Sequence, residues 1–328
     1  MTLLSIGRPA EYVDIKSMIF DWQFKCNPHD DGRSPFLVGA LDDETIVALN
    51  GYMPARIKFQ GRPIHSCWSC DTYVSPSFRG RGFGKELVSR VSAAAPVMLG
   101  YGISDMSDPI FDKYDWLLHP HIDLLFFHVA EKGLAGRVKN LGSRLTRKRN
   151  GSAGSSSTVS HEEGQWFSGE VDALWTESRA GYFSTVERDA AYLNWKYQQH
   201  PLNRYTSYSL RSNARLRGVL IARHDPEESV IVDYCGPADD VRAMCELASA
   251  AVEDLSHRAT KRIRCETTHP AMIEALKRAG FISSRYTSRF RVRSNESAID
   301  PLKDWFLMPG DSDNDMLSQI ERHVDSAH

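Results

Sequence analysis

The sequence predicts an α+β protein made of two copies of one fold, each a mixed, largely antiparallel sheet flanked by helices. Three observations support this prediction. A meander of apolar strands leads into an amphipathic helix in the first half of the chain. Strands and helices then alternate. The same order of elements recurs after a Gly/Ser-rich stretch, which indicates a second and partly degraded copy.

The first half begins with an apolar helical face over residues 11–24. Strands are expected over 35–42, 45–59 and 64–74, with turn sequences between them. A helix follows from residue 83, places apolar residues on one face, and is stopped by Pro96. A buried strand (97–104), a short helix (108–116) and a further strand (122–129) complete this half.

The second half repeats this order. Paired strands, a third strand, a helix, a strand and a second helix are expected in turn over 205–211, 217–224, 229–236, 238–257, 261–268 and 270–280. Residues 281–292 are expected to continue the same sheet.

The predicted domains are 1–132 and 161–328, joined by a linker at 133–160 that is basic first and then rich in Gly and Ser. Its charge run is typical of a solvated linker, and an arm that contacts phosphate or lipid headgroups is the alternative.

Composition limits the function classes. The chain has 328 residues, of which 41% are hydrophobic and 25% charged, as in ordinary globular proteins. A net charge of -2 gives no sign of a general nucleic-acid or membrane surface. No apolar run approaches the roughly 20 residues of a membrane span, and the first residues do not resemble a signal peptide. We expect a cytoplasmic protein without a nucleic-acid partner, and a homodimer is one assembly that the sequence allows.

Six scattered cysteines indicate reduced thiols rather than a disulfide framework. Cys67 and Cys70 form a C-x-x-C pair, but a zinc site would need a second pair or suitably spaced histidines. The pair also lies in a predicted strand, which points the two thiols to opposite faces. We therefore predict no metal site.

The stretch "RGRGFGK" (79–85) joins a strand to a helix and could hold a phosphate. The dinucleotide fingerprint fails, because its third glycine would fall at Lys85 or Leu87. The P-loop pattern also fails, because Arg79 stands where its first glycine belongs. A third pattern, [QR]-x-x-G-x-[GA], is met by Arg79, Gly82 and Gly84.

This third pattern has a physical reason. Backbone N–H groups at a strand-to-helix turn point into one concavity, and the helix dipole adds positive potential there. Gly82 and Gly84 let a pyrophosphate approach without obstruction by side chains. Basic side chains of Arg79, Arg81 and Lys85 can add charge. A tight glycine turn without a ligand is the alternative for an isolated match.

With its strand and helix, "DTYVSPSFRGRGFGKELV" (71–88) resembles the central strand and acyl-CoA loop of the GNAT superfamily of N-acyltransferases. The resemblance covers about residues 1–130. The second half is similar in element order but has no such loop, which implies one CoA site. Two segments, 188–205 and 304–315, look like tandem-GNAT proteins, some of which acylate nucleotide-linked amino sugars.

The resemblance implies roles for particular residues. Pantetheine would lie along Thr72, Tyr73 and Val74 of the central strand. The pyrophosphate of acetyl-CoA or another short-chain acyl-CoA would lie on the loop of Arg79, Gly80, Arg81, Gly82, Phe83, Gly84 and Lys85. A tyrosine often protonates the leaving thiolate in this family. Here Phe111 stands at its position, and Tyr114, one turn further, is the substitute.

An acceptor amine must lose a proton before it attacks a thioester, so a nearby carboxylate would help as general base. We predict Asp71 for this role, because strand alternation places it on one face with Ser69 and Tyr73. A carboxylate that only hydrogen-bonds a neighbouring turn is the alternative. Asp311 and Asp313 could bind the acceptor, or they could be a polar chain end.

These inferences predict an N-acyltransferase that acts on a small polar amine, with a nucleotide-linked amino sugar as preferred acceptor. An aminoglycoside, a polyamine or a protein amine is the second enzyme hypothesis. A non-catalytic CoA-binding sensor or scaffold is the hypothesis from another class, and the missing tyrosine favours it slightly.

Overall fold

The computed structural model describes residues 10–30, 32, 36–41, 45–129, 157–286, 288–296, 300–313 and 315. Most of the predicted linker, at 133–156, lies outside these residues. From Ser157 the chain already forms strand β7 (Ser157–Glu163). None of the helices in the described part of the chain is both long and apolar enough to cross a membrane.

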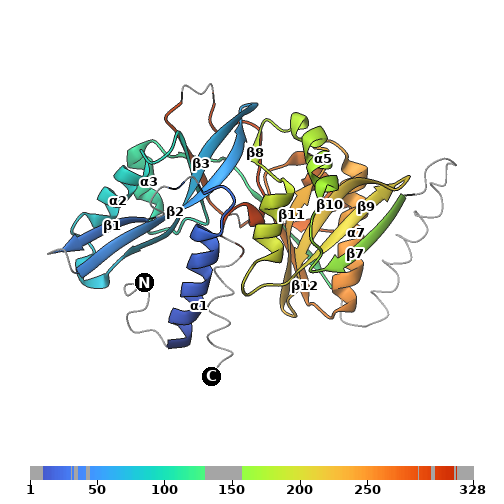
Figure 1. The fold of residues 1–328 in the computed structure, drawn as a ribbon, viewed down its shortest axis with the longest axis horizontal. Helices are drawn as coiled ribbons and strands as arrows, with labels where there is room; N and C mark the ends of the chain where they lie inside the picture. Colours follow the sequence, from blue (N-terminus) through green and yellow to red (C-terminus); the bar gives the residue numbers. More distant parts are fainter. Residues whose placement is uncertain are drawn as a thin grey trace.

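The first sheet contains the predicted meander and occupies one half of the molecule (Figure 1). Its strands are β1 (Phe36–Leu41), β2 (Thr45–Phe59), β3 (Arg62–Val74), β4 (Val97–Tyr101), β5 (Leu117–Leu118), β8 (Ser184–Val186), β14 (Phe290–Ser294) and β15 (Trp305–Phe306). The order is β15-β8-β2-β3-β4-β14-β5, with β1 also paired to β2. β2 and β3 are antiparallel, whereas β3 and β4 are parallel.

The second sheet repeats this arrangement in the other half. Its further strands are β6 (Asp123–His128), β9 (Tyr205–Ser212), β10 (Arg215–Arg223), β11 (Glu228–Cys235), β12 (Arg262–Thr267) and β13 (Ile282–Ser283), in the order β13-β6-β12-β11-β10-β9-β7. Again an antiparallel pair, β10 and β11, is followed by a parallel pair, β11 and β12. The predicted α+β class is confirmed, and the two mixed sheets are consistent with two GNAT-like domains.

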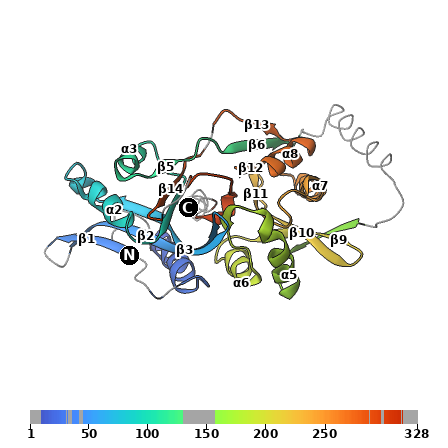
Figure 2. The same ribbon diagram turned by 90° about the horizontal axis from the view of Figure 1, so that it is seen from above.

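Each half contributes to the other sheet, and the second half adds β8 and β15 to the first sheet as well as β14. β6 comes from the first half but lies between β12 and β13 of the second sheet. β14 comes from the second half but lies between β4 and β5 of the first. The prediction that residues 281–292 continue the second sheet is therefore right for β13 and wrong for β14. Figure 2 shows β14 beside β5, and β6 beside β13.

Helices flank both sheets. They are α1 (Ala10–Phe20), α2 (Phe83–Val91), α3 (Asp108–Phe111), α5 (Gly169–Ser178), α6 (Ala190–Leu193), α7 (Val241–His257) and α8 (Pro270–Arg278), with π-helical turns η1 (Asp21–Lys25) and η5 (Asn194–Gln198) and 3₁₀ turns η2 (Pro76–Phe78), η3 (Asp112–Tyr114), η4 (Arg179–Gly181) and η6 (Pro309–Asp311). α2 buries Leu87, Val88 and Val91, the face expected from its sequence.

Two tryptophan residues, one from each half of the chain, contact each other. The indole N–H of Trp22 on η1 donates to the carbonyl of Trp195 on η5 (2.8 Å), and the indole N–H of Trp195 donates to the carbonyl of Trp22 (2.9 Å). The two rings stack with centroids 4.8 Å apart. Stacked and reciprocally bonded indoles fix the first helix against the second half of the chain.

Candidate active site

The glycine-rich loop leaves open space at the start of α2. Gly80 and Gly82 have φ angles of 78° and 95°, in the left-handed region that glycine adopts without strain. A Cβ added at either glycine would meet no atom within 4 Å. Gly82 caps α2, and the carbonyl of Gly82 accepts a hydrogen bond from the N–H of Glu86 (3.1 Å). The N–H groups of the first helical turn are thereby presented to an unobstructed side.

Basic side chains surround this helix start. Arg79, Arg81 and Lys85 are exposed. The Nε of Arg79 donates to the carbonyl of Val74 at the end of β3 (3.2 Å). The guanidinium of Arg81 lies over the ring of Phe78, 4.9 Å from its centroid. The loop thus combines helix-end amides with positive charge, the combination that binds phosphate.

The central strand β3 has an unpaired edge beside this loop. Its parallel pairing with β4 covers Ser66, Cys67 and Trp68, although β3 continues to Val74. Along Thr72, Tyr73 and Val74, the edge facing β4 therefore has no ladder partner within the described part of the chain. Free backbone groups on such an edge can pair with an extended ligand, as in strand addition.

A β-bulge interrupts β3 at Asp71. Cys70 lies opposite Gly51 and Tyr73 opposite Leu49, so Asp71 and Thr72 together face Asn50. Asp71 has a φ of 49°, unusual for a residue other than glycine. The carboxamide oxygen of Asn50 accepts from the hydroxyls of Ser69 (3.0 Å) and Thr72 (2.5 Å). The prediction that Asp71 shares a face with Ser69 and Tyr73 by simple alternation is wrong, because the bulge shifts the alternation by one residue.

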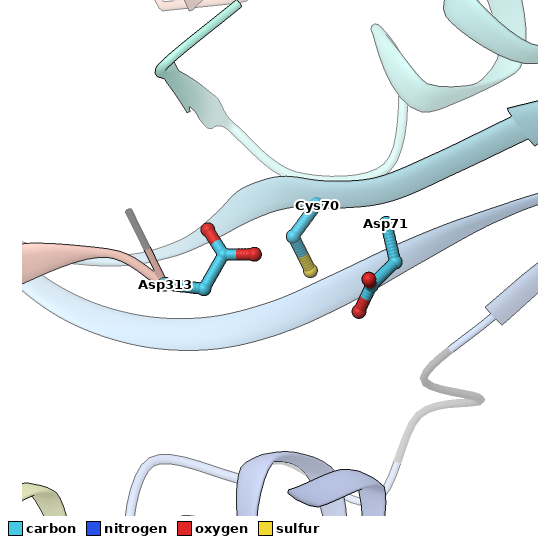
Figure 3. A group of neighbouring side chains, drawn as sticks. All are labelled: Cys70, Asp71 and Asp313. Carbon is cyan, nitrogen blue, oxygen red and sulfur yellow. The ribbon is translucent and has the colours of Figure 1, made fainter. Parts of the chain in front are cut away.

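The Asp71 side chain lies in a buried polar cluster with residues from distant parts of the sequence. The Nζ of Lys16 on α1 is 3.0 Å from Asp71 Oδ1. A carboxylate oxygen of Asp71, one of Asp313 and the Sγ of Cys70 lie within 4.8 Å of one another. Figure 3 shows the thiol between the two carboxyl groups. The Nε2 of Gln23 is 3.4 Å from the same sulfur. We call Lys16, Cys70, Asp71 and Asp313 the carboxyl cluster.

Burial sets the protonation of this cluster. It raises the pKa of Asp313 from 3.8 to about 7, with the neighbouring Asp71 as the next cause. Burial also raises the pKa of the Cys70 thiol well above its usual range, so this thiol is neutral. Carboxyl and thiol groups are metal-ligand types, but Lys16 already places a cation on Asp71. We assign no metal to the cluster.

The predicted acid lies in a different environment. Tyr114 ends η3 and packs, partly buried, against the apolar cluster of Cys67, Phe111 and Trp116. Phe111, at the position of the family tyrosine, is 4% exposed, and its ring meets Trp116 edge-on at 5.0 Å. The structure thus brings Asp71 together with Asp313, and places Tyr114 with the apolar cluster instead.

Sequence reasoning did not place Lys16 and Asn50 in the site, since a lone lysine on a helix and an asparagine in a strand carry no motif. The sequence predicts Asp313 as a residue that binds the acceptor or belongs to a polar chain end, but not as a neighbour of Asp71. Its position in "GDSDND" (310–315), a run of acidic residues directly after an apolar segment, was the available signal.

Residues 6–103 match the model of the acetyltransferase (GNAT) family. The match covers less than a third of the chain. Among curated proteins, none matches the sequence. Together with the fold, the family match supports an acyltransferase, and the GNAT fold is one that binds acyl-CoA.

Solved structures show the same fold over most of the chain. A GCN5-related N-acetyltransferase from Kribbella flavida is 12% identical, with a TM-score of 0.52 over 79% of this chain and 60% of its own. One from Anabaena variabilis is 10% identical, with a TM-score of 0.52 over 87% and 70%. Saccharomyces cerevisiae N-myristoyltransferase with bound myristoyl-CoA and inhibitors is 12% identical, with a TM-score of 0.53 over 84% and 71%. At these identities the likeness establishes the fold alone, and the chain spans about three fifths of the Kribbella protein.

Proposed function

We propose that this protein transfers an acetyl or short acyl group from acyl-CoA to the amine of a small polar acceptor. The observation that carries the proposal is the open glycine loop at the start of α2, adjoining the unpaired edge of β3. One anionic ligand with an extended arm would satisfy both features, and CoA has a pyrophosphate and a pantetheine of that kind.

In this proposal the pyrophosphate binds along Arg79–Lys85, where glycines leave space and three basic side chains add charge. Pantetheine extends along Thr72, Tyr73 and Val74, and its amides pair with the strand backbone. The thioester then lies near the bulge at Asp71. A backbone N–H of β3, such as that of Val74, donates to the oxyanion that develops.

Asp71 is the proposed general base for the acceptor amine, and Lys16 Nζ lies 3.0 Å from its Oδ1. Tyr114 is the proposed proton donor to the leaving thiolate, with water as the alternative. A Tyr114→Phe variant separates the two, because loss of a general acid lowers kcat by about 100-fold or more. An unchanged kcat would assign this step to water.

For the acceptor we propose a nucleotide-linked amino sugar. The two segments that resemble the amino-sugar subgroup, 188–205 and 304–315, are in contact, since Arg188 pairs with Asp311 (2.6 Å) and Lys196 Nζ donates to the carbonyl of Ser312 (2.5 Å). In this proposal they form the acceptor wall from the second half. We also propose a cytoplasmic location, which the six free cysteines fit.

A CoA-binding sensor is the second candidate. It is favoured by Phe111, which is buried at the position of the family tyrosine and has no hydroxyl group that can donate a proton. A sensor and an enzyme both bind CoA, so turnover distinguishes them.

The test is thiol release from acetyl-CoA in the presence of amino-sugar nucleotides, aminoglycosides, polyamines and peptide amines. The proposal expects release that depends on one class of amine and saturates with it. CoA binding without amine-dependent release for any class would reject the enzyme and leave the sensor.

A further inference from the structure

The carboxyl of Asp313 is the feature of the candidate site that the proposed function leaves unexplained. Asp313 follows η6 and is 7% exposed. Within the described residues we find no donor to its carboxyl other than its own backbone N–H. In Figure 3 this carboxyl points toward Cys70, with Asp71 beyond the thiol. A buried carboxyl without a partner is costly unless it holds a proton or shares one.

The second half of the chain holds Asp313 in this place. The two residues that precede it are anchored, because Asp311 pairs with buried Arg188 and the Ser312 carbonyl accepts from Lys196. We call residues 309–313 the tail. Because the tail is fixed at Asp311 and Ser312, the side chain of Asp313 cannot easily turn away from Asp71. The approach of Asp313 to Asp71 is therefore imposed by the fold.

The charged and titratable groups around Asp313 come from several elements. Asp71 and Cys70 lie on β3, Lys16 on α1 and Lys196 on η5. Asp71 opposes ionisation of Asp313, whereas Lys196 and Lys16 favour it. Lys16 contacts Asp71 directly, and Lys196 is 3.9 Å from Asp315 Oδ1. Both cations therefore interact mainly with other carboxylates. Among the carboxyl groups of this cluster, that of Asp313 keeps a proton most readily.

We propose that Asp313 is a positioning residue whose carboxyl, held close to that of Asp71, forms with it an ionised pair that takes up one proton from the acceptor amine. This inference rests on the proposed function. Two close carboxyl groups titrate as a pair, in which the first proton leaves easily and the second is retained. The fully ionised pair therefore takes up its first proton near neutral pH, where an isolated surface aspartate is too weak a base.

The proton count balances. The acceptor ammonium gives one proton to the ionised carboxyl pair, which returns it to solvent after turnover. The neutral nitrogen attacks the thioester carbon, a C–N bond forms and the C–S bond breaks. The nitrogen loses a second proton, and the leaving thiolate gains one. The products are an N-acyl amine, CoA thiol and one proton in solution.

Carbon-13 NMR of the full-length protein, labelled at the aspartate carboxyl carbons, tests the pair without substrate. Asp313→Asn identifies the Asp313 signal. We expect that signal to titrate near pH 7 in the wild type, to move to lower pH in Asp71→Asn, and to move to higher pH in Lys16→Met. Asp105→Asn, on an exposed aspartate, is the control and should leave it unmoved. Titration of Asp313 below about pH 5, or no shift in Asp71→Asn, would overturn the proposal.

The pH profile of thiol release gives the second readout. Asp313→Asn should lower the rate at neutral pH and move the acidic limb of the profile to lower pH, and Asp313→Glu should restore part of both. A lower rate with an unmoved limb would indicate a merely structural role and contradict the inference. Wild-type protein that releases no thiol with any amine would reject the proposed function, and the NMR titration would still decide the pair.

Discussion

At the scale of the residue, one extra position in β3 shapes the candidate site. The bulge turns Asp71 toward α1 and the chain end, where Lys16 and Asp313 meet it. Asn50 stabilises the bulge by accepting from the hydroxyls of Ser69 and Thr72, on either side of Asp71. The left-handed backbone of Asp71 costs about 1 kcal/mol or more, which the surrounding contacts must offset. Strain of this kind at a polar buried position is typical of functional sites.

His29 gives a pH-dependent prediction at this scale. It is 3% exposed, its ring stacks on Tyr192, and its Nδ1 accepts from the backbone N–H of Arg56 (3.0 Å). Burial, with Arg56 and His65 as lesser causes, lowers the pKa of His29 from 6.5 to about 3. Only the unfolded chain binds this proton in that window, so stability should fall as pH falls from about 6.5 toward 3. The loss is up to about 1.4 kcal/mol per pH unit.

Urea unfolding at about pH 6 and pH 4 measures this loss. His29→Phe removes the group and should reduce the difference between the two conditions, whereas His128→Phe, on an exposed histidine, should leave it unchanged. Equal pH dependence in wild type and His29→Phe would show that another group controls acid stability.

The sequence predicted the backbone conformation of the glycine loop better than the surroundings of Asp71. Glycine spacing depends on local backbone geometry, and Gly80 and Gly82 adopt the left-handed conformations that such a loop needs. The bulge depends on which residues of β2 lie opposite β3, and strand alternation alone does not specify that register. Lys16 and Asp313 reach Asp71 only through tertiary packing, so no spacing rule could connect them.

At the scale of the element, the C-terminal segment joins the two sheets. β15 extends the first sheet beside β8, and η6 follows it against the second half. The guanidinium of Arg188 is fully buried and pairs with Asp233 on β11 (2.7 Å) and with Asp311 on η6 (2.6 Å). It also donates to Thr185 and to the carbonyl of Val186 on β8. One side chain therefore connects both sheets and the tail.

Arg188→Met should destabilise the protein by about 3–5 kcal/mol, because it leaves two buried carboxyl groups without their cation. Chemical denaturation measures the change. Arg215→Met, which breaks the exposed pair with Glu177, should cost less than about 1 kcal/mol. Similar effects for the two variants would mean that the tail is not held by Arg188.

Helices and strands could be predicted where the hydrophobic pattern along the sequence is clear. Which strands pair with each other could not be predicted. The apolar face of α2, the long β2 and the buried β4 follow from local periodicity. Whether β14 pairs with its own half or with the other is decided by the two edges that each sheet leaves open. A short strand such as Phe290–Ser294 carries no signal that distinguishes those edges.

At the scale of the whole molecule, the exchange of β6 and β14 makes the halves interdependent. The first sheet lacks β8, β14 and β15 without the second half of the chain, and the second sheet lacks β6 without the first. We therefore predict one cooperative unfolding transition despite the size of the chain. Far-UV circular dichroism and tryptophan fluorescence should give coincident urea curves. Two separated transitions would indicate that the halves unfold independently.

The two halves repeat one fold, but only the first carries the glycine loop, between β3 and α2. The corresponding junction between β11 and α7 has Gly236 followed by Pro237 and no run of basic residues. The asymmetry assigns donor binding to the first half and leaves the second half to hold the tail and, in our proposal, the acceptor.

Calorimetric titration of CoA into wild type, Gly82→Glu and Gly61→Glu tests the central claim most directly. Gly61 is the matched control, since it also has a positive φ (82°) and open space around it, but it lies in the β2–β3 turn. We predict that wild type and Gly61→Glu bind one CoA equally well, whereas Gly82→Glu loses at least about tenfold in affinity, because its carboxylate repels the pyrophosphate. Equal CoA binding by Gly82→Glu and wild type would contradict the placement of the donor on this loop.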